Sequence, residues 1–138
     1  DVIELTMDIF NEEYVHFKAE EAVIISKIDR TQLIRIITNL VKNAIQAFPE
    51  NQQSKAVCVN VKKVLSNVII TVADNGMGIA KEDFNRIFEP KFTTKSSGMG
   101  LGLGIIKNII ENYKGTITLE SQIGKGTTFT VSLPIINT

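Results

Sequence analysis

Hydrophobic residues recur at steps of three and four residues in several segments of the chain, which is the spacing of an α-helix with one buried face. The strongest of these segments runs from Thr31 to Phe48, and Pro49 marks its end. A second one opens in the glycine-rich segment 98–104 and continues to Tyr113. The pattern therefore predicts two substantial helices. Shorter periodic segments add a short helix and a helical tail, at Lys81–Ile87 and Asp1–Phe10.

Runs of apolar and β-branched residues between turn residues predict the strands. In chain order these are Tyr14–Lys18, Ala22–Ser26, Lys55–Val64, Val68–Ala73, Gly115–Ser121 and Thr127–Leu133. A turn at Ser66-Asn67 predicts that the two middle strands pair as a hairpin. Consecutive strands are expected to be antiparallel. The predicted fold class is α+β, a two-layer sandwich with a mixed, mostly antiparallel sheet of about five strands and three helices on one face.

Composition favours one soluble domain spanning 1–138, with residues 1–10 as the tail of an upstream helix or linker. An apolar content of 43% and a charged content of 22% argue against disorder and against a membrane span. No signal-peptide pattern is present, and the lone Cys58 suits a reducing compartment, so we expect a cytoplasmic domain, whether or not its parent is membrane-bound. Because the net charge is zero and basic residues form no dense stripe, no nucleic acid partner is expected.

Glycines provide the first sign of a ligand site. Eight of the nine fall into three clusters, Gly76/Gly78, Gly98/Gly100/Gly102/Gly104 and Gly124/Gly126. Glycine lets backbone N–H groups approach a ligand closely, and a helix that opens at 98–104 offers a phosphate-binding N-terminus. Turn chemistry alone is the alternative for any one cluster. The spacing matches neither a P-loop nor a dinucleotide fingerprint.

Polar residues between the clusters suggest which ligand is bound. Asp74 ends an apolar strand, and its carboxylate only accepts hydrogen bonds, which suits the exocyclic amine of adenine and disfavours guanine. Asn39 and Asn43 lie one turn apart on the first long helix, with Gln46 further along. Amide oxygens are suitable ligands for a Mg²⁺ ion that bridges nucleotide phosphates. A surface pair bonded to each other or to water is the alternative for the two asparagines.

In this order the motifs resemble those of the GHKL or Bergerat-fold ATP-binding proteins, and within them the catalytic ATP-binding domain of sensor histidine kinases. The matching segments are the N box Asn39–Ala44, the G1 box Asp74–Ile79, the F box Phe88–Lys95, the G2 box Gly98–Leu103 and the terminal G-x-G-T at Gly124–Thr127. The resemblance covers most of the chain. It implies ATP and Mg²⁺ as ligands, Asn43 as the metal ligand, Asp74 as the adenine-binding residue, and a lid over the nucleotide from about residue 88 to residue 100.

The expected site follows from these segments. The catalytic candidates are Asn39, Asn43 and Lys95, and Asn43 is also the metal candidate. The nucleotide-binding candidates are Asn43, Gln46, Asp74, Gly76, Gly78, Ile79, Phe88, Thr94, Gly98, Gly100, Leu101, Gly102, Leu103 and Thr127. Related ATPases carry a Glu general base where this chain has Asn39, and an amide cannot accept a proton at neutral pH. Phosphoryl transfer to an external acceptor is therefore expected rather than hydrolysis, and the F box, which those ATPases lack, agrees.

The acceptor is expected outside this chain. His16 is its only histidine and lies in a strand-like segment without the surroundings of the family's phosphoacceptor helix. The resemblance implies a dimerisation and phosphoacceptor helical hairpin of the same full-length protein, with a response regulator receiver domain reached through it. The chain by itself is expected to be monomeric and the full-length protein homodimeric. Two alternatives stay open: a non-catalytic nucleotide-binding switch module, and a GHKL serine kinase of the anti-sigma type.

Overall fold

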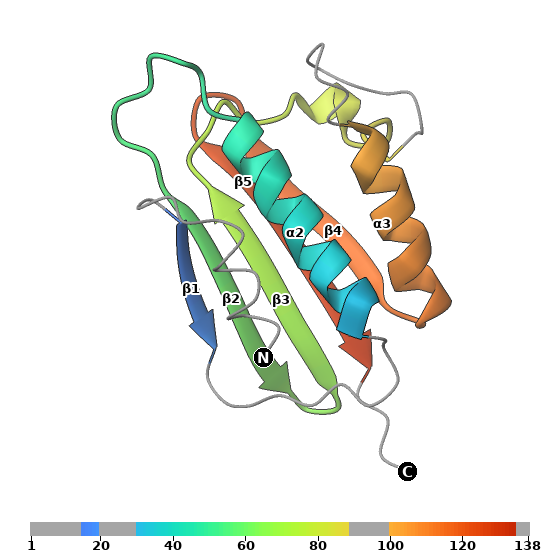
Figure 1. Cartoon of the computed structure of the whole chain (residues 1–138). Helices are drawn as coiled ribbons and strands as arrows, with labels where there is room; N and C mark the ends of the chain where they lie inside the picture. Colours follow the sequence, from blue (N-terminus) through green and yellow to red (C-terminus); the bar gives the residue numbers. More distant parts are fainter. Residues whose placement is uncertain (1–14, 20–29, 89–99, 135–138) are drawn as a thin grey trace.

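The computed structural model describes residues 15–19, 30–88 and 100–134. Its elements in chain order are strand β1 (Val15–Ala19), helix α2 (Arg30–Gln46), strands β2 (Val57–Val64) and β3 (Asn67–Asp74), the 3₁₀ turn η1 (Lys81–Asp83), helix α3 (Gly100–Asn112), and strands β4 (Thr116–Gln122) and β5 (Gly126–Pro134). The strands form one sheet in the order β1-β2-β3-β5-β4 (Figure 1). The expected strand at 22–26 and the expected helical tail at 1–10 lie outside the described residues.

The predicted hairpin of β2 and β3 is confirmed, and its turn falls one residue earlier than expected. Val64 pairs with Asn67, and Leu65 takes a positive φ of 55° to close the turn. The strand pairs β2–β3, β3–β5 and β4–β5 are all antiparallel. Strands β1 and β2, by contrast, pair in parallel, because α2 lies between them in the chain and gives the long crossover that parallel strands need. The mixed, mostly antiparallel sheet of the predicted fold is therefore confirmed.

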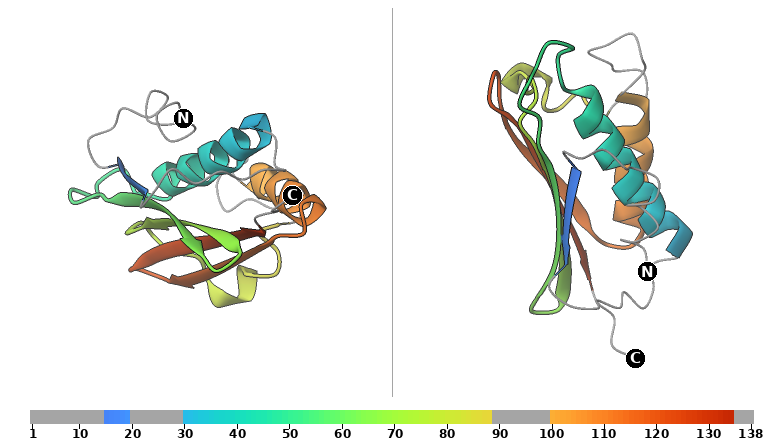
Figure 2. Two further views of the ribbon diagram at one scale, coloured as in Figure 1. Left: turned by 90° about the horizontal axis from the view of Figure 1, so that it is seen from below. Right: turned by 60° about the vertical axis from the view of Figure 1, so that its left-hand side comes forward.

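Helices α2 and α3 lie together on one face of the sheet (Figure 2). The apolar spacing of α2 places Ile36, Ile37 and Leu40 in the core, where they are at most 1% exposed. On β3 the residues that face the helices are buried and alternate with less buried ones, as the two-residue period of a strand requires. Helices and sheet thus enclose one hydrophobic core in two layers, as the sequence predicts.

The third predicted helix is wrong in kind. The segment Lys81–Ile87 forms only the 3₁₀ turn η1, in which the N–H groups of Asp83 and Phe84 donate to carbonyls three residues earlier. So short a segment gains too few hydrogen bonds to offset the cost of starting an α-helix, whereas a 3₁₀ turn forms in short pieces. Among the described residues the sheet is covered by two α-helices, and η1 lies at the end of the sheet where β3 ends (Figure 1).

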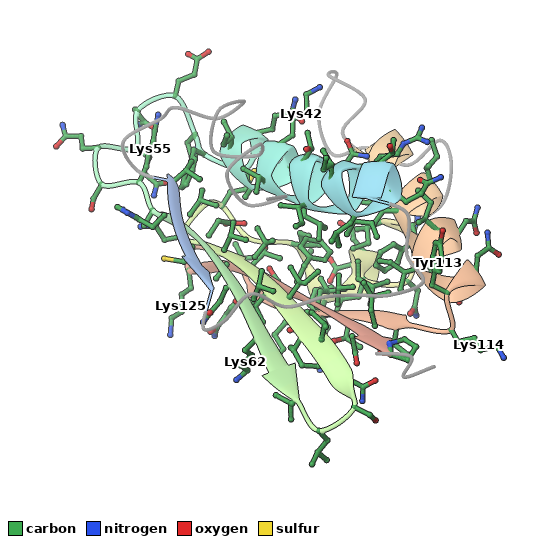
Figure 3. All side chains as sticks on the ribbon, turned by 60° about the horizontal axis from the view of Figure 1, so that its bottom comes forward. Lys42, Lys55, Lys62, Tyr113, Lys114 and Lys125 are labelled. Atoms are coloured by element: carbon green, nitrogen blue, oxygen red, sulfur yellow. The ribbon has the colours of Figure 1, made fainter. Side chains whose placement is uncertain are left out.

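Charged side chains are spread around the molecule. The labelled lysines Lys42, Lys62, Lys114 and Lys125 come from four different elements or turns; in Figure 3, Lys42 lies at the top, Lys114 at the lower right, and Lys62 and Lys125 at the lower left. All four are exposed. Such a distribution is typical of a solvated surface and differs from the dense basic stripe of a nucleic-acid-binding face. Over the described ranges, no helix combines the length and apolar character needed to cross a membrane.

Candidate functional site

Four elements meet at one end of the sheet. Strand β3 ends there at Asp74, β5 begins at Gly126, α2 ends at Gln46, and α3 begins at Gly100 (Figure 1). The antiparallel pairing of β3 and β5 places Asp74 directly opposite Thr127. Segments that lie far apart in the sequence are therefore brought to one place by the order of the strands.

A cleft of about 410 Å³, counting the part that opens to solvent, lies between the helices and this end of the sheet. The residues that line it are Asn43, Ala44, Ala47, Asp74, Met77, Gly78, Ile79, Leu103, Thr127 and Phe129. Most of these side chains are apolar, and the few polar ones include a carboxylate. This composition, mostly apolar with a few polar groups, is usual for a small-molecule site.

Asp74 is the ionisable group of this cleft. Desolvation by burial raises the pKa of its carboxyl from 3.8 to about 6, although hydrogen bonds from the backbone N–H groups of Gly76 and Thr127 act in the opposite direction. The Gly76 N–H lies 2.8 Å from Oδ1 of Asp74. The carboxyl is therefore mostly ionised at pH 7.5, and it offers lone pairs to a ligand from a partly desolvated position.

The loop after Asp74 packs tightly against α2 and the β4–β5 turn. The N–H of Met77 donates to the carbonyl of Ala47 at 3.0 Å, and the N–H of Gly124 donates to the carbonyl of Met77 at 2.9 Å. A Cβ on Gly76 would lie 2.8 Å from the Ala47 carbonyl oxygen. Gly78 has a φ of 79°, and a Cβ there would collide with the backbone of Gln122. The two glycines of this cluster are therefore required by close backbone contacts, which also hold the loop in place under the cleft.

Asn43 is the polar residue that α2 contributes to the cleft. Its Nδ2 atom is buried and has no hydrogen-bond partner among the described residues. A half-turn of the amide exchanges nitrogen and oxygen, so the same position can present an oxygen to a cation. The described residues contain no group of three or more His, Cys, Asp or Glu side chains able to hold a metal by themselves. A single amide oxygen at Asn43 is compatible with an ion such as Mg²⁺, which takes one or two protein oxygens and completes its shell with phosphates and water.

The predicted site residues Ile79 and Thr127 line the cleft, and the other predicted site residues within the described ranges divide into three groups. Asn39 and Gln46 are half-buried on α2 and do not line the cleft. Phe88 packs partly buried against the core, with Nζ of Lys107 5.1 Å from its ring centre, and it does not line the cleft either. The last group is at the start of α3: Gly100, Leu101 and Gly102 form the first turn of the helix, and Leu103 lines the cleft. Thr94, Lys95 and Gly98 lie outside the described residues.

His16 lies on β1, at the edge of the sheet, and its side chain is exposed. Two strands, β2 and β3, separate β1 from β5 and the Thr127 side of the cleft.

Several residues of the cleft were not predicted as site residues. Ala44, Ala47 and Phe129 have the spacing of core residues, and at this end of the sheet the core face is also the wall of the cleft. The small size of Ala44 on α2 and of Ala47 just after it was an available signal, because it leaves room beside the helix. Ser121 was also missed, since it contacts the site only through hydrogen bonds to Ile79, Gly126 and Thr127.

Comparison with known proteins gives consistent matches. The model of the family described as histidine kinase-, DNA gyrase B- and HSP90-like ATPase matches residues 28–137. The sensor histidine kinase ZraS of Escherichia coli K12 is 40% identical over 121 residues, which make up 88% of this chain and 25% of that protein. Sporulation kinase A of Bacillus subtilis is 42% identical over 106 residues, or 77% of this chain and 17% of that protein.

Among solved structures, the catalytic domain of histidine kinase ThkA superposes with a TM-score of 0.82 at 30% identity, and the match covers 97% of this chain and 90% of that domain. The chain thus spans a quarter or less of the two curated relatives and nearly the whole of the solved catalytic domain.

Proposed function

Because this chain belongs to the histidine kinase-, DNA gyrase B- and HSP90-like ATPases, and within them to the catalytic ATP-binding domains of sensor histidine kinases, we propose that it binds Mg²⁺·ATP in the Asp74 cleft and donates the γ-phosphoryl group to a histidine on a separate domain. The observation that carries this proposal is the cleft itself. One cavity combines a desolvated carboxylate with a buried amide that lacks a partner among the described residues.

Base recognition is assigned to Asp74. An ionised carboxylate accepts hydrogen bonds and donates none, so it favours the amino group of adenine over the carbonyl of guanine. Ile79, Leu103 and Phe129 supply the apolar walls that a purine ring would cover. Gly78 contributes to the same wall with backbone alone, which leaves room for the ring.

Phosphate and metal are assigned to the two helix ends beside the base site. The N–H groups at the start of α3 have no partners within the helix and favour negative charge. Asn43 would hold the ion. Bound Mg²⁺ would neutralise phosphate charge as the phosphoryl group leaves. The protein contributes orientation and electrostatic stabilisation, which are the main contributions to phosphoryl transfer.

The external acceptor is assigned from Asn39 and from the relatives. Asn39 is half-buried one turn before Asn43, and its amide cannot take a proton from water at neutral pH. The relatives ZraS and sporulation kinase A are about four to six times longer than the matched segment. A phosphoacceptor hairpin of the parent protein, dimerisation through that hairpin and a response regulator downstream are part of this proposal, and so is a cytoplasmic location.

Phosphoryl transfer is the direct test. The chain, γ-labelled ATP and Mg²⁺ are mixed with the histidine-bearing hairpin of the same parent protein, and label is followed on both polypeptides. We expect acid-labile label on the hairpin, which is the behaviour of phosphohistidine, and none on a hairpin whose histidine is replaced by alanine. A His16→Ala chain should transfer as well as the wild type. Acid-stable label would favour a serine kinase, and normal ATP binding without any label would favour a switch module.

Asn43→Ala tests the metal assignment. Mg²⁺ should raise the ATP affinity of the wild type, and loss of the oxygen ligand should make this increase smaller by a factor of about ten or more. The reason is that interactions with charged groups contribute roughly 1.5–3 kcal/mol. The measurement is calorimetric titration of ATP with Mg²⁺ and with EDTA. Asn108→Ala, a change at an exposed position on α3, is the matched control and should bind as the wild type does. An Asn43→Ala chain that keeps the full Mg²⁺ effect would show that the residue is structural.

A further inference from the structure

Ser121 of β4 joins three segments through a single hydroxyl group. Its Oγ accepts the N–H of Ile79 at 2.7 Å, donates to the carbonyl of Gly126 at 2.9 Å, and lies 2.7 Å from Oγ1 of Thr127. Ser121 and Thr127 are direct cross-strand partners of β4 and β5. Thr127 in turn pairs with Asp74 on β3, so the three side chains form one row across the sheet at the base of the cleft.

Once the Ser121 proton is assigned to the Gly126 carbonyl, the chemistry of these groups determines the direction of the remaining hydrogen bond. A serine hydroxyl has one proton and two lone pairs. The Ile79 N–H is only a donor and occupies one lone pair, while the Gly126 carbonyl is only an acceptor and takes the proton. The remaining lone pair of Ser121 faces Thr127, so the Thr127 hydroxyl is the donor of the 2.7 Å contact. Every hydrogen-bonding position of Ser121 is then used.

The direction of this bond decides what Thr127 can offer to a ligand. Thr127 is 4% exposed and lines the cleft. With its proton held by Ser121, its Oγ1 has only lone pairs left to present. Its backbone N–H is also committed, because it donates to the Asp74 carboxylate. The carboxylate beside it likewise only accepts.

We infer that Ser121 is a positioning residue that locks the Thr127 hydroxyl as an acceptor, so that the floor of the cleft selects a purine with an amino group at position 6. This inference rests on the proposed ATP-binding function and adds a residue that has no contact with the ligand. Asp74 by itself disfavours a carbonyl at position 6, but a free Thr127 hydroxyl beside it is able to turn and donate to that carbonyl. Ser121 removes this alternative.

Ser121→Ala tests the inference with ATP and ITP, which carry an amino group and a carbonyl, respectively, at position 6. The full chain is titrated with each nucleotide, and the ratio of the two dissociation constants is the readout. We expect wild type to prefer ATP and Ser121→Ala to narrow the preference by about five- to tenfold, the effect of reversing one hydrogen bond. Ser121→Thr, which keeps the hydroxyl, should keep the ratio. Ser66→Ala, the same change at the exposed β2–β3 turn, is the matched control.

A double-mutant cycle separates positioning from general loosening of the fold. In a Thr127→Val chain the hydroxyl is absent, so adding Ser121→Ala should leave the ATP to ITP ratio unchanged. A purely structural Ser121 would weaken both nucleotides equally in either background, and that result would overturn the inference while the proposed function stands. If wild type itself fails to bind ATP or to prefer it over ITP, the proposed function fails and the inference fails with it.

Discussion

Replacing Asp74 with asparagine is expected to lower ATP affinity by about 100-fold or more at pH 7.5, a loss of roughly 2.7 kcal/mol. The carboxylate accepts with both oxygens, whereas the amide keeps one acceptor and adds an N–H₂ donor that opposes the adenine amino group. The Gly76 N–H, which donates to Oδ1 of Asp74, still finds an oxygen when the amide takes the orientation that keeps its oxygen there, so the turn after β3 should keep its shape. Calorimetric titration of both chains with ATP gives the measurement.

The same substitution is expected to stabilise the ligand-free chain at pH 7.5. The pKa of Asp74 is raised from 3.8 to about 6 by burial. A raised carboxyl pKa means that the folded state holds the proton more tightly than the unfolded state does. The resulting stabilisation is fully present below pH 3.8 and is lost as the pH rises through about 6. Above that range the buried charge opposes folding, and the neutral amide of the Asp74→Asn chain removes that charge.

Thermal unfolding from pH 4 to pH 8 tests the sign. At pH 7.5 the free energy of unfolding of the Asp74→Asn chain should exceed that of the wild type by about 1 kcal/mol, a value that allows for the partial exposure of the group. This difference should shrink toward pH 4. Asp83→Asn is the control for binding, since the Asp83 side chain contacts Arg86 at 3.9 Å and does not line the cleft, and this variant should bind ATP as the wild type does. A variant that binds ATP normally, or that is destabilised equally at every pH, would contradict the assignment of Asp74.

The sheet and both long helices could be predicted because local sequence determines them. Apolar residues at helical spacing define α2, and the run that ends at Asp74 defines β3. Hydrogen-bonding capacity alone indicated a base site at Asp74, and the structure places this residue in the cleft with Asn43 and Thr127. These features depend on a residue and its near neighbours, which is the information that a sequence pattern contains.

Features that depend on pairing between distant segments could not be predicted in the same way. The parallel pairing of β1 with β2 depends on where α2 returns the chain. The hydroxyl network of Ser121 depends on the register of β4 against β5 and on the position of the loop at Ile79. The length of η1 depends on whether the hydrogen bonds gained in a short segment offset the free-energy cost of starting an α-helix. In each case the deciding energy comes from a partner remote in sequence or from a small difference between local states.

Replacing Gly126 with alanine is expected to destabilise the fold much more than replacing Gly124, although the two glycines lie two residues apart and both have positive φ. Gly124 has a φ of 82°, and no atom lies within 4 Å of the position that a Cβ would take, so alanine there costs only backbone strain, about 1 kcal/mol. Gly126 has a φ of 130°, and its Cβ would collide with the carbonyl oxygen of Asp74 and lie 2.9 Å from Cα of Asn75. Strain and overlap together should cost about 3 kcal/mol or more.

The collision at Gly126 also reaches the site, because relieving it separates the start of β5 from the end of β3. Thr127 would then separate from Asp74 and Ser121, and ATP binding should be lost at temperatures where Gly126→Ala is still folded. Urea unfolding gives the two stability losses, and titration with ATP below the unfolding transition gives the effect on binding. Equal losses for the two variants would mean that the close contact of β5 with Asp74 is not required. A destabilised Gly126→Ala chain with unchanged ATP affinity would show that the row from Asp74 to Ser121 tolerates a shift of β5, and would separate the stability of the sheet from the geometry of the base site.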